Sequence, residues 1–385
     1  MIKTAQRTAG ITPFIAMDIL ERVKALEAQG RHVIQLQLGE PDFDTPAVIK
    51  EAHGRALAGG QTHYTPSMGD PALKEALSAY YKKRYQVEVA PERFFICPGS
   101  SAGLTMLFSA LLDPGDQVIM SDPHYPCYEN MVKFFGGQTK CVTVQEDEGF
   151  LYRPEDIKAA LSPEVKAVVI NSPANPTGTI LGPDRLKQIA ALGRLVISDE
   201  IYHGLTYGEE PAHSILEYTD QAVVINGFSK IFAMTGWRLG YVILPPDRDM
   251  IRTMTVLTQN FMISTSAAVQ KAGICALEKA WPEVEIMRQT YDKRRQLLLA
   301  GLNRLGLRVK VEPTGAFYIL ANARHLSGDS YALAFDILDK AGVATDPGID
   351  FGAGAEGFLR FSYASSDANI EEALHRLAKY LEDRA

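Results

Sequence analysis

The segment 226–240, NGFSKIFAMTGWRLG, places two cations, Lys230 and Arg238, between two apolar runs. The runs are AVVI at 222–225 and YVIL at 241–244, and both have the composition of buried strands. Burying an unpaired charge is costly, so cations at strand ends need solvent or an anionic ligand. A deprotonated lysine can attack a carbonyl carbon, whereas an arginine offers a fixed fork of donors to a phosphate or carboxylate.

Other apolar runs of the chain are also followed at once by glycine or polar residues. The carboxyl ends of parallel strands meet at one edge of an open sheet, and ligands bind there. The residues expected at that edge are the turn GSSAG (99–103) after FFICP, Asn171 and Asn175 after KAVVI, Asp199 and Tyr202 after RLVIS, and Ser229 and Lys230 after AVVIN. Taken singly, each has an ordinary explanation as a solvated loop, a turn or a helix cap.

Together these residues match the needs of one ligand. A pyridine-aldehyde phosphate requires an amine for a Schiff base, which Lys230 can supply, and a carboxylate at its ring nitrogen, which Asp199 can supply. The turn 99–103 with Ser229 and Arg238 can bind the phosphate. Tyr125 can cover the pyridine ring, and Tyr202 with Asn175 can donate to its phenolic oxygen. The sequence therefore predicts a pyridoxal 5'-phosphate site.

The elements that position these residues alternate between strands and helices from about residue 47 to 245. Runs that are apolar on both faces predict parallel strands covered by helices on both sides, such as the helix expected over 182–193. Only about ten residues lead from AVVIN to RLGYVIL, which is short for a helical crossover, so the last strand is predicted to be antiparallel. The predicted fold class is α/β, with a mostly parallel, doubly wound sheet. Its strands are expected within 94–100, 116–123, 166–173, 194–200 and 221–229.

A second, smaller α+β part is expected after residue 245. The pattern predicts a long helical stretch over roughly 265–305, paired strands over 307–322, a strand over 358–364 and an amphipathic helix over 369–383. A helix over 14–29 and a half-exposed strand over 32–39 are expected to join this part. We therefore expect a large domain of residues 46–285 and a small domain formed by 1–45 and 286–385.

Composition excludes several classes of protein. The net charge of −7 provides no basic field for nucleic acid or an anionic membrane. The four cysteines are scattered without C-x-x-C spacing, which indicates neither a disulfide framework nor a metal site. Apolar runs long enough to span a membrane are absent, as is a signal-peptide pattern, so a cytoplasmic protein without a membrane partner is expected.

Several motifs carry a resemblance to a known family: GEPDFDTP, YTPSMGDPALKEAL, NSPANPTG, SDEIY, SKIFAMTGWRLGY, PTGAFYIL and LRFSYA. The chain resembles the class I/II aminotransferases of fold type I, which use pyridoxal phosphate, in their aspartate-aminotransferase-like branch. The motifs occur in the family's order from about residue 11 to 375. The resemblance implies a ping-pong transfer of an amino group from an L-amino acid to a 2-oxo acid, within amino acid metabolism.

The resemblance also implies roles for particular residues. Lys230 would be the Schiff-base lysine and general base, and Asp199 would keep the pyridine nitrogen protonated. Tyr202 and Asn175 would bind the ring oxygen, and Tyr125 would stack on the ring. The phosphate would contact backbone groups and side chains of Ser100, Ser101, Ala102, Ser229 and Arg238.

Substrate and partner contacts follow from the same resemblance. Arg360 would hold the substrate α-carboxylate, assisted by Asn175 and the backbone of Gly39. Tyr64 would reach the cofactor phosphate of a neighbouring subunit, which implies a homodimer.

The chain departs from the family pattern at Gly227, where many relatives carry a serine, so one phosphate donor is expected to be missing. Some aspartate-specific relatives carry a lysine in the phosphate loop, whereas this loop reads Ser100-Ser101. The neutral segment GITPFIAM (10–17) favours an apolar or aromatic substrate, although core packing explains the segment equally well.

Two other functions share parts of this pattern. A C–S β-lyase on the same fold would use the same cofactor residues. A ligand-sensing domain of a transcription regulator is disfavoured, because the helix expected from about residue 12 leaves no room for a preceding DNA-binding region.

Overall fold

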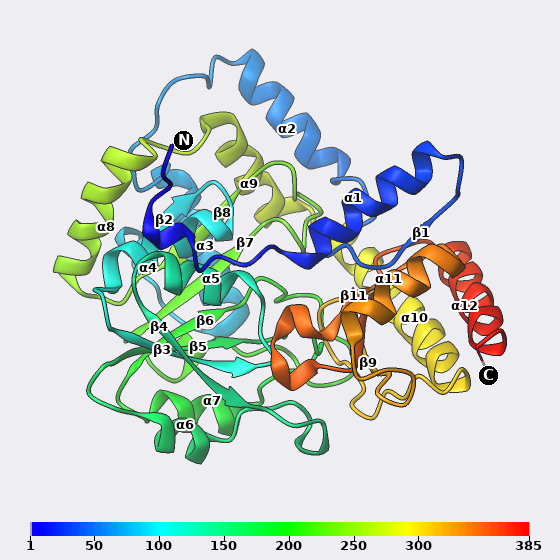
Figure 1. Ribbon diagram of the computed structural model, residues 1–385. Coiled ribbons are helices and arrows are strands. Elements are labelled where there is room, and N and C mark those ends of the chain that lie inside the picture. Colours follow the sequence, from blue (N-terminus) through cyan, green and yellow to red (C-terminus); the bar gives the residue numbers. More distant parts are fainter. Residues whose placement is uncertain (1, 385) are drawn as a thin grey trace.

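The structure is a computed structural model that describes residues 2–384. Its centre is a seven-stranded sheet in the order β2-β8-β7-β6-β5-β3-β4 (Figure 1). Strand β8 pairs antiparallel with both of its neighbours, whereas the other pairs are parallel. The predicted α/β class is therefore confirmed, including the antiparallel last strand. The strands are β2 (Phe94–Cys97), β3 (Gln117–Asp122), β4 (Gln138–Thr143), β5 (Val165–Asn171), β6 (Leu195–Asp199), β7 (Ala222–Gly227) and β8 (Gly240–Ile243).

Helices cover both faces of this sheet because its strands are apolar on both sides. In β7, Val223 and Ile225 join one core with helices α4 (Ser100–Leu111), α5 (Cys127–Phe134) and α8 (Arg248–Phe261). Ala222 and Val224 point to the opposite core. That core includes residues of α3 (Pro71–Tyr85), α6 (Pro154–Ala160), α7 (Pro183–Ala190) and α9 (Ala267–Lys279), while α2 (Ala47–Ala58) packs against α9.

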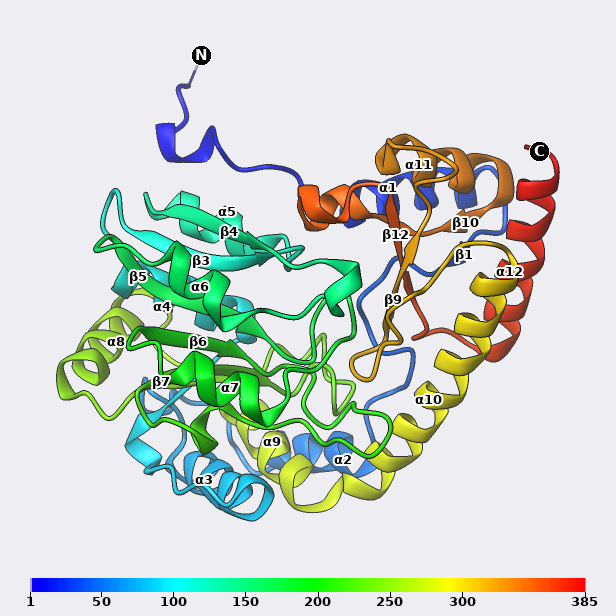
Figure 2. The same ribbon diagram turned by 90° about the horizontal axis from the view of Figure 1, so that it is seen from below.

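The remaining elements lie together beside one end of the sheet, as Figure 2 shows. A three-stranded sheet in the order β11-β12-β9 packs with α10, α11 and α12, and the short strand β1 pairs with β10. The bounds are α1 (Ile15–Ala28), β1 (Ile34–Gln35), α10 (Trp281–Arg304), β9 (Tyr318–Asn322), α11 (Ser330–Ala341), β10 (Val343–Ala344), β11 (Asp346–Pro347), β12 (Phe358–Ser362) and α12 (Asp367–Glu382). The domain boundary expected at 285 falls within the first turns of α10. Short 3-10 helices are η1 (Gln6–Thr8), η2 (Pro91–Arg93), η3 (Glu146–Glu148), η4 (Ile215–Glu217), η5 (Gly348–Phe351) and η6 (Ala353–Ala355).

Four local expectations differ from the structure. The predicted pair of strands over 307–322 is wrong in its first half, because only isolated bridges, of Arg308 with Asn322 and of Gly315 with Thr206, form before β9 begins. The helical stretch over 265–305 is two helices, which meet at Ala280 just before Pro282. Strand β1 has two residues instead of the eight expected over 32–39. The sequence QTKCVT, which forms β4, was not predicted as a strand because this edge strand is mostly exposed and polar.

Within residues 2–384, no helix is both long and apolar enough to cross a membrane. The same residues contain no cluster of three or more His, Cys, Asp or Glu side chains that could hold a metal ion. The four cysteines are free thiols.

Candidate active site

A pocket of about 300 Å³ opens where the carboxyl ends of β5, β6 and β7 face β12 and the segment after β1. It brings together residues that are far apart in the sequence but were predicted as one site. Those lining it are Gly39, Ser100, Ser101, Tyr125, Asn175, Asp199, Tyr202, Ser229, Lys230, Arg238 and Arg360. Two predicted residues, Ala102 and Tyr64, do not line the pocket.

Lys230 lies in the turn that follows β7 and points its amine into the pocket. The Lys230 Nζ donates a hydrogen bond to the backbone oxygen of Gly39, at 2.5 Å. Burial lowers the pKa of the Lys230 amine to about 8; Arg360 and Arg238 lower it as well, while Glu40 opposes them. A substantial neutral fraction therefore exists near neutral pH, which a nucleophilic amine requires.

Asp199 is the last residue of β6, and its carboxylate is buried. The Oδ2 atom accepts a hydrogen bond from the Tyr128 hydroxyl at 2.6 Å, and Oδ1 accepts one from the backbone N–H of Ile201 at 3.1 Å. Burial raises the pKa of the Asp199 carboxyl to about 6, against the opposing effect of these two hydrogen bonds. Asp199 is thus ionised at neutral pH, and a cationic ring nitrogen would find a fixed anion there.

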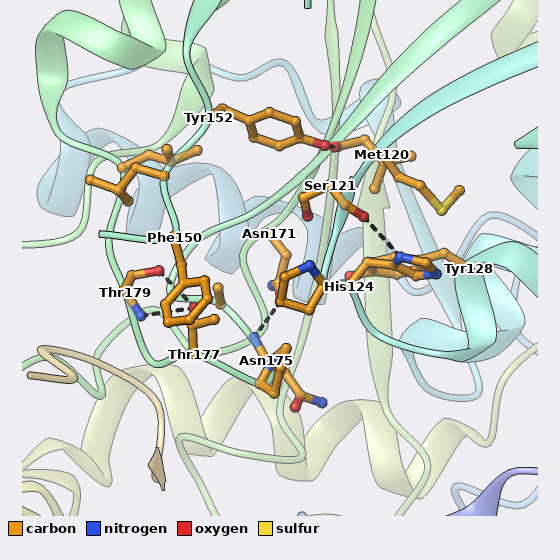
Figure 3. Close-up of a pocket in the computed structure, with 16 residues that line it drawn as sticks. Met120, Ser121, His124, Tyr128, Phe150, Tyr152, Asn171, Asn175, Thr177 and Thr179 are labelled. Atoms are coloured by element: carbon orange, nitrogen blue, oxygen red, sulfur yellow. Dashed lines mark hydrogen bonds between the residues drawn. The ribbon is translucent and has the colours of Figure 1, made fainter. Parts of the chain in front are cut away.

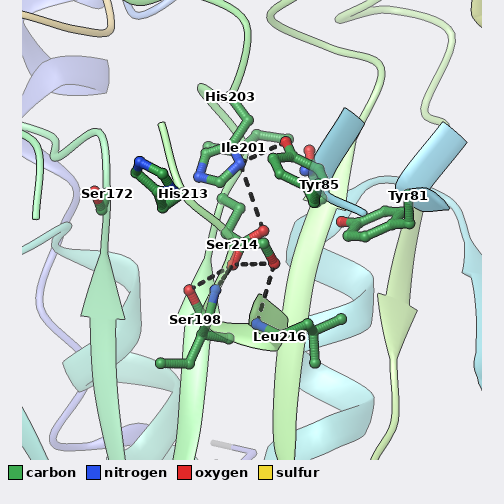
Figure 4. A network of polar contacts seen from close by, with 12 residues as sticks. Tyr81, Tyr85, Ser172, Ser198, Ile201, His203, His213, Ser214 and Leu216 are labelled. Atoms are coloured by element: carbon green, nitrogen blue, oxygen red, sulfur yellow. Dashed lines mark hydrogen bonds and ion pairs between the residues drawn. The ribbon is translucent and has the colours of Figure 1, made fainter. Parts of the chain in front are cut away.

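The turn that carries Asp199 and Tyr202 is supported from behind by a buried polar network (Figure 4). The Oε1 atom of Glu200 accepts hydrogen bonds from the hydroxyls of Ser198 and Ser214, at 3.0 and 3.1 Å. The Nδ1 atom of His203 lies 2.7 Å from the Tyr85 hydroxyl. Burial lowers the pKa of His203 to about 3, so the imidazole is neutral. These bonds tie the turn to β6, η4 and α3, which fixes the direction of the two pocket side chains.

The start of helix α4 forms a cradle that suits an anion. The N-cap residue Gly99 has φ +89, and a Cβ at this position would lie 2.2 Å from Nη2 of Arg238. Only glycine therefore allows the guanidinium to approach the helix N-terminus, where the helix dipole also favours negative charge. Arg238 itself has φ +54, and its Nη1 donates to the backbone oxygen of Thr235 at 2.9 Å. Ser100 and Ser101 occupy the first turn, whereas the N–H of Ala102 already donates to the Gly99 oxygen at 3.1 Å.

The departure at Gly227 has a structural reason. Gly227 pairs with Gly240 at the ends of β7 and β8. A Cβ on Gly240 would lie 2.6 Å from the Ser100 nitrogen, and one on Gly227 would lie 3.1 Å from the Leu239 oxygen. The two glycines let the strand ends pack directly against the start of α4, and a side chain at 227 would have to displace backbone.

Arg360 is buried on β12 and faces the opposite wall of the pocket. Its Nη1 donates to Oδ1 of Asn175 at 2.7 Å, and its Nη2 donates to the Gln37 oxygen at 2.6 Å. The same Nη2 also pairs with the carboxylate of Asp346. A planar guanidinium held in this way can receive a carboxylate in a fixed orientation.

Aromatic rings fix the plane of the guanidinium and the position of Tyr202. The Arg360 guanidinium carbon lies 4.3 Å from the ring centre of Tyr318 and 4.7 Å from that of Phe351. The hydroxyls of Tyr318 and Tyr202 are 2.8 Å apart. A Cβ at Gly39 would lie 2.3 Å from the Tyr318 oxygen, so this glycine allows the close approach of the tyrosine.

One wall of the pocket is apolar. Phe14, Ala16 and Met17 line it, and the ring of Phe14 meets that of Tyr125 edge-on with centroids 6.2 Å apart. The segment 10–17 thus lines the pocket and also contributes Ala16 to the buried residues, while the substrate preference expected from it stays a prediction.

Behind Asn175 and Tyr128 lies a separate cavity of about 30 Å³, which is large enough for a water molecule (Figure 3). His124 borders this cavity, and its Nδ1 lies 2.8 Å from the Ser121 oxygen. Burial lowers the pKa of His124, so the imidazole is neutral at neutral pH. The cavity therefore adds no charge behind the pocket wall.

Sequence reasoning missed three residues that act on the predicted ones: Tyr128, Tyr318 and Asp346. Tyr128 lies at the start of α5 and its backbone N–H donates to the oxygen of Tyr125 just before the helix, so the spacing of three residues could have indicated that the two tyrosines lie close together. Tyr318 lies within the motif PTGAFYIL, which drew attention to the segment without assigning a residue. No signal in the sequence pointed to Asp346.

The pocket thus holds an amine with a lowered pKa, a buried carboxylate, and an arginine beside a helix N-terminus. The family model for class I and II aminotransferases matches residues 31–377, and the chain belongs to this family. The predicted family and the predicted aminotransferase activity are confirmed.

Curated relatives match over nearly the whole chain. The aspartate/prephenate aminotransferase of Thermus thermophilus is 39% identical, over 98% of both chains. The (5-formylfuran-3-yl)methyl phosphate transaminase of Methanocaldococcus jannaschii is 37% identical, over 98% of this chain and 99% of its own. Among solved structures, an aspartate aminotransferase from Thermus thermophilus with maleate aligns with a TM-score of 0.94 and 38% identity, over 98% of this chain and 100% of its own. The fold-type I architecture is thereby confirmed.

Proposed function

We propose that the protein transfers an amino group from an L-amino acid to a 2-oxo acid with pyridoxal 5'-phosphate held by Lys230, Asp199 and the start of α4. The observation that carries this proposal is the placement of the Lys230 amine, with its lowered pKa, in one pocket with Asp199 and Arg360. The Gly99 cradle supports it, because the absence of a Cβ leaves Arg238 beside the helix N-terminus for a phosphate. The names of the relatives favour this reaction over a C–S β-lyase.

The cofactor, when bound, supplies an aldehyde that condenses with amines and a ring that accepts electrons from the bond being broken. Asp199 would hold the ring nitrogen in its protonated state, because an ionised buried carboxylate favours a cation beside it. Tyr202 and Asn175 would donate to the phenolic oxygen, Tyr125 would cover one face of the ring, and Ser229 would add a contact to the phosphate.

Arg360 would bind the α-carboxylate of the substrate, and Asn175 and the backbone of Gly39 would complete its orientation. The amine of Lys230, once free of the cofactor, would take the proton from the substrate α-carbon and deliver it to the cofactor side. The hydrogen bond from the Lys230 amine to the backbone oxygen of Gly39 supports this role, because Gly39 is one of the proposed substrate contacts. A second substrate, a 2-oxo acid, would reverse these proton transfers.

A neutral side chain suits the rest of the pocket. Its cations are Lys230, Arg238 and Arg360, and each already has a role. Glu40, which accepts a hydrogen bond from Thr235, adds a negative charge that would repel a distal carboxylate. The apolar wall of Phe14 and Met17 supports an apolar or aromatic amino acid, and a panel of amino donors would identify it. The relatives differ in their named substrates, which include aspartate, prephenate and valine, so their names do not decide the matter.

We further propose that the enzyme acts as a homodimer. Tyr64 lies in the segment between α2 and α3 with 81% of its surface exposed, away from the pocket of its own chain. An exposed tyrosine at this place in the motif HYTPSMGD supports a contact with the phosphate site of a neighbouring subunit.

Replacing the lysine tests the proposal directly. We expect the purified wild-type protein to absorb visible light through the bound cofactor, and borohydride to fix the cofactor to Lys230 in a peptide map. Lys230→Ala should lose transamination by a factor of at least about 10⁴, because both the nucleophile and the general base are removed. Lys82→Ala is a suitable control, since Lys82 is an exposed residue in the last turn of α3 that pairs with Glu88 and does not line the pocket.

Full activity in Lys230→Ala would contradict the proposal. So would a wild-type protein that releases pyruvate from L-cystathionine but exchanges no amino group with 2-oxo acids, which would assign a β-lyase instead.

A further inference from the structure

Arg360 has a buried anionic partner before any substrate arrives. Asp346 is 0% exposed and pairs with Arg360, which is 2% exposed. Among the residues that the structure describes, Oδ1 of Asp346 and Nε of Arg360 have no hydrogen-bond partner. The pair is therefore incompletely satisfied by hydrogen bonds, although Nη2 of Arg360 donates to the Asp346 carboxylate.

The groups around Asp346 come from each element packed against it. Arg360 on β12 is its only cationic neighbour among residues 2–384, Asp350 on η5 adds a second carboxyl, and Tyr318 on β9 adds a phenol. Burial raises the pKa of Tyr318, so this phenol is neutral. Asp350 accepts a hydrogen bond from the backbone N–H of Ile15 at 3.1 Å and is committed to the start of α1.

A substrate carboxylate bound to Arg360 would change the net charge of the buried pair. One guanidinium would then face two carboxylates in a buried site, and an excess negative charge in a medium of low dielectric constant is costly. Protonation of the Asp346 carboxyl removes this excess charge at the lowest cost in free energy. Burial already raises the pKa of the Asp346 carboxyl to about 7, so its protonation is within reach at physiological pH.

We propose that Asp346 is a positioning residue that takes up one proton when a substrate α-carboxylate binds Arg360, which makes substrate affinity depend on pH. This inference rests on the proposed function, since it requires that Arg360 binds the α-carboxylate. By linkage, the protonated form of Asp346 binds the carboxylate more tightly, and binding raises the pKa of Asp346 further. The KM for the amino acid should therefore rise by up to about tenfold for each pH unit above 7, until the pKa of the complex is reached.

The test uses the wild-type holoenzyme and the near-isosteric variant Asp346→Asn. Binding of 3-phenylpropanoate, an unreactive carboxylate, is followed by calorimetry at pH 7.5 in buffers with different heats of ionisation, which counts the protons taken up. The visible absorbance of the cofactor is recorded in parallel, so that any proton taken up by the cofactor itself is subtracted. The KM of an accepted amino acid is then measured between pH 7 and 9.

We expect an uptake of up to about three quarters of a proton at pH 7.5 in the wild type, because about one quarter of Asp346 is already protonated there, and we expect this uptake to be lost in Asp346→Asn. The variant should have a KM that no longer rises with pH, and at pH 8.5 its KM should be at least about tenfold below that of the wild type, because the competing anion is gone. Asp350→Asn is the matched control: it removes the neighbouring carboxyl but leaves Asp346 in place, and it should retain the proton uptake.

Two results would overturn the inference. One is a wild-type enzyme that takes up no proton and whose KM does not depend on pH. The other is a variant Asp346→Asn whose KM is raised by the same factor at every pH, which would mean that Asp346 only holds Arg360 in place. The wild-type measurement decides the matter even if the variant does not fold. Failure of the proposed function is a different result, namely the absence of transamination in the wild type.

Discussion

At the scale of single residues, one hydroxyl helps to keep Asp199 charged. Burial raises the pKa of this carboxyl, and the short hydrogen bond from Tyr128 is the largest of the effects that oppose it. The ionised state is the useful one, because only an anion stabilises a protonated pyridine nitrogen. Tyr128 therefore controls the pH at which the site becomes competent.

The variant Tyr128→Phe should move the acid side of the pH profile upward. A hydrogen bond to a charged group is worth about 1.5–3 kcal/mol, so its loss should raise the pKa of Asp199 by about one to two units. Asp199 is ionised above about pH 6 in the wild type. In the variant, kcat/KM at pH 7 should fall by about two- to tenfold and recover towards pH 9. The measurement is a profile of kcat/KM against pH.

Tyr152→Phe provides the control, since the buried Tyr152 hydroxyl donates to the Val169 oxygen and does not contact Asp199. Its profile should keep the wild-type position. A loss in Tyr128→Phe that is equal at all pH values would show that Tyr128 acts through packing instead.

The sequence predicted side chains that follow strands, because a strand end and a polar residue are both visible locally. The structure places Lys230, Asp199, Asn175 and Arg360 around one pocket as expected, while their roles stay predictions. Asp346 could not be predicted, because its importance comes from a cross-strand pair with Arg360 on β12. The sequence of neither segment indicates which strand it pairs with or in which register.

At the scale of elements, the junction of β2, β8 and α4 depends on glycines that bring three backbones together. Gly99 begins α4 with a positive φ, and Arg238 reaches over it from the end of the turn before β8. A methyl group at this point would meet the guanidinium rather than open space.

Gly99→Ala should therefore weaken cofactor binding through displacement of Arg238. The loss of a charge-assisted contact predicts a dissociation constant for pyridoxal phosphate that is at least about tenfold higher, measured by absorbance titration of the apoenzyme. The change also costs about 1–2 kcal/mol in stability because alanine avoids positive φ. Gly115→Ala separates the two effects: it has φ +97 but nothing within 4 Å of the added methyl group. Equal cofactor affinity in both variants would refute the role of the cradle.

Elements were predicted best where hydrophobic periodicity was strong and uninterrupted. Helices α1, α7 and α12 lie where their apolar spacing indicated. The buried strands β6 and β7 lie within the predicted runs, and β5 begins one residue before its run. The alternating segment 307–311 failed as a strand because alternation shows only that one face is buried and does not provide a partner. Strand β4 was missed because backbone pairing with β3 forms it despite its polar side chains.

At the scale of the whole molecule, sites shared between the two subunits of a dimer can be detected through the activity of hybrid dimers. If Tyr64 contributes to the site of the neighbouring subunit, then Tyr64→Ala damages the partner's site, whereas Lys230→Ala damages the site of its own chain. Hybrid dimers formed by mixing and refolding the two inactive variants should regain activity, because each hybrid contains one intact site. The activity of the mixture, measured against each variant alone and alongside sedimentation analysis, checks this.

Mixing Lys230→Ala with Asp199→Ala supplies the control, since both side chains belong to the pocket of the same chain. In that control, the intact site cannot form, because every pocket lacks one of the two residues. Activity in the control, or none in the Tyr64 mixture, would contradict the shared site.

The hydrogen bond from Arg360 to Gln37 joins residues that are 323 positions apart, and the bond from Arg360 to Asn175 spans 185. Contacts of such long sequence separation form late in folding, because the chain entropy of closing the loops must be overcome first. A nascent chain can complete the large sheet before β12 has left the ribosome, so the wall that carries Arg360 is added after the sheet. We therefore expect productive capture of the cofactor to follow the synthesis of β12, and a chain truncated before β12 to fold in part without gaining a working site.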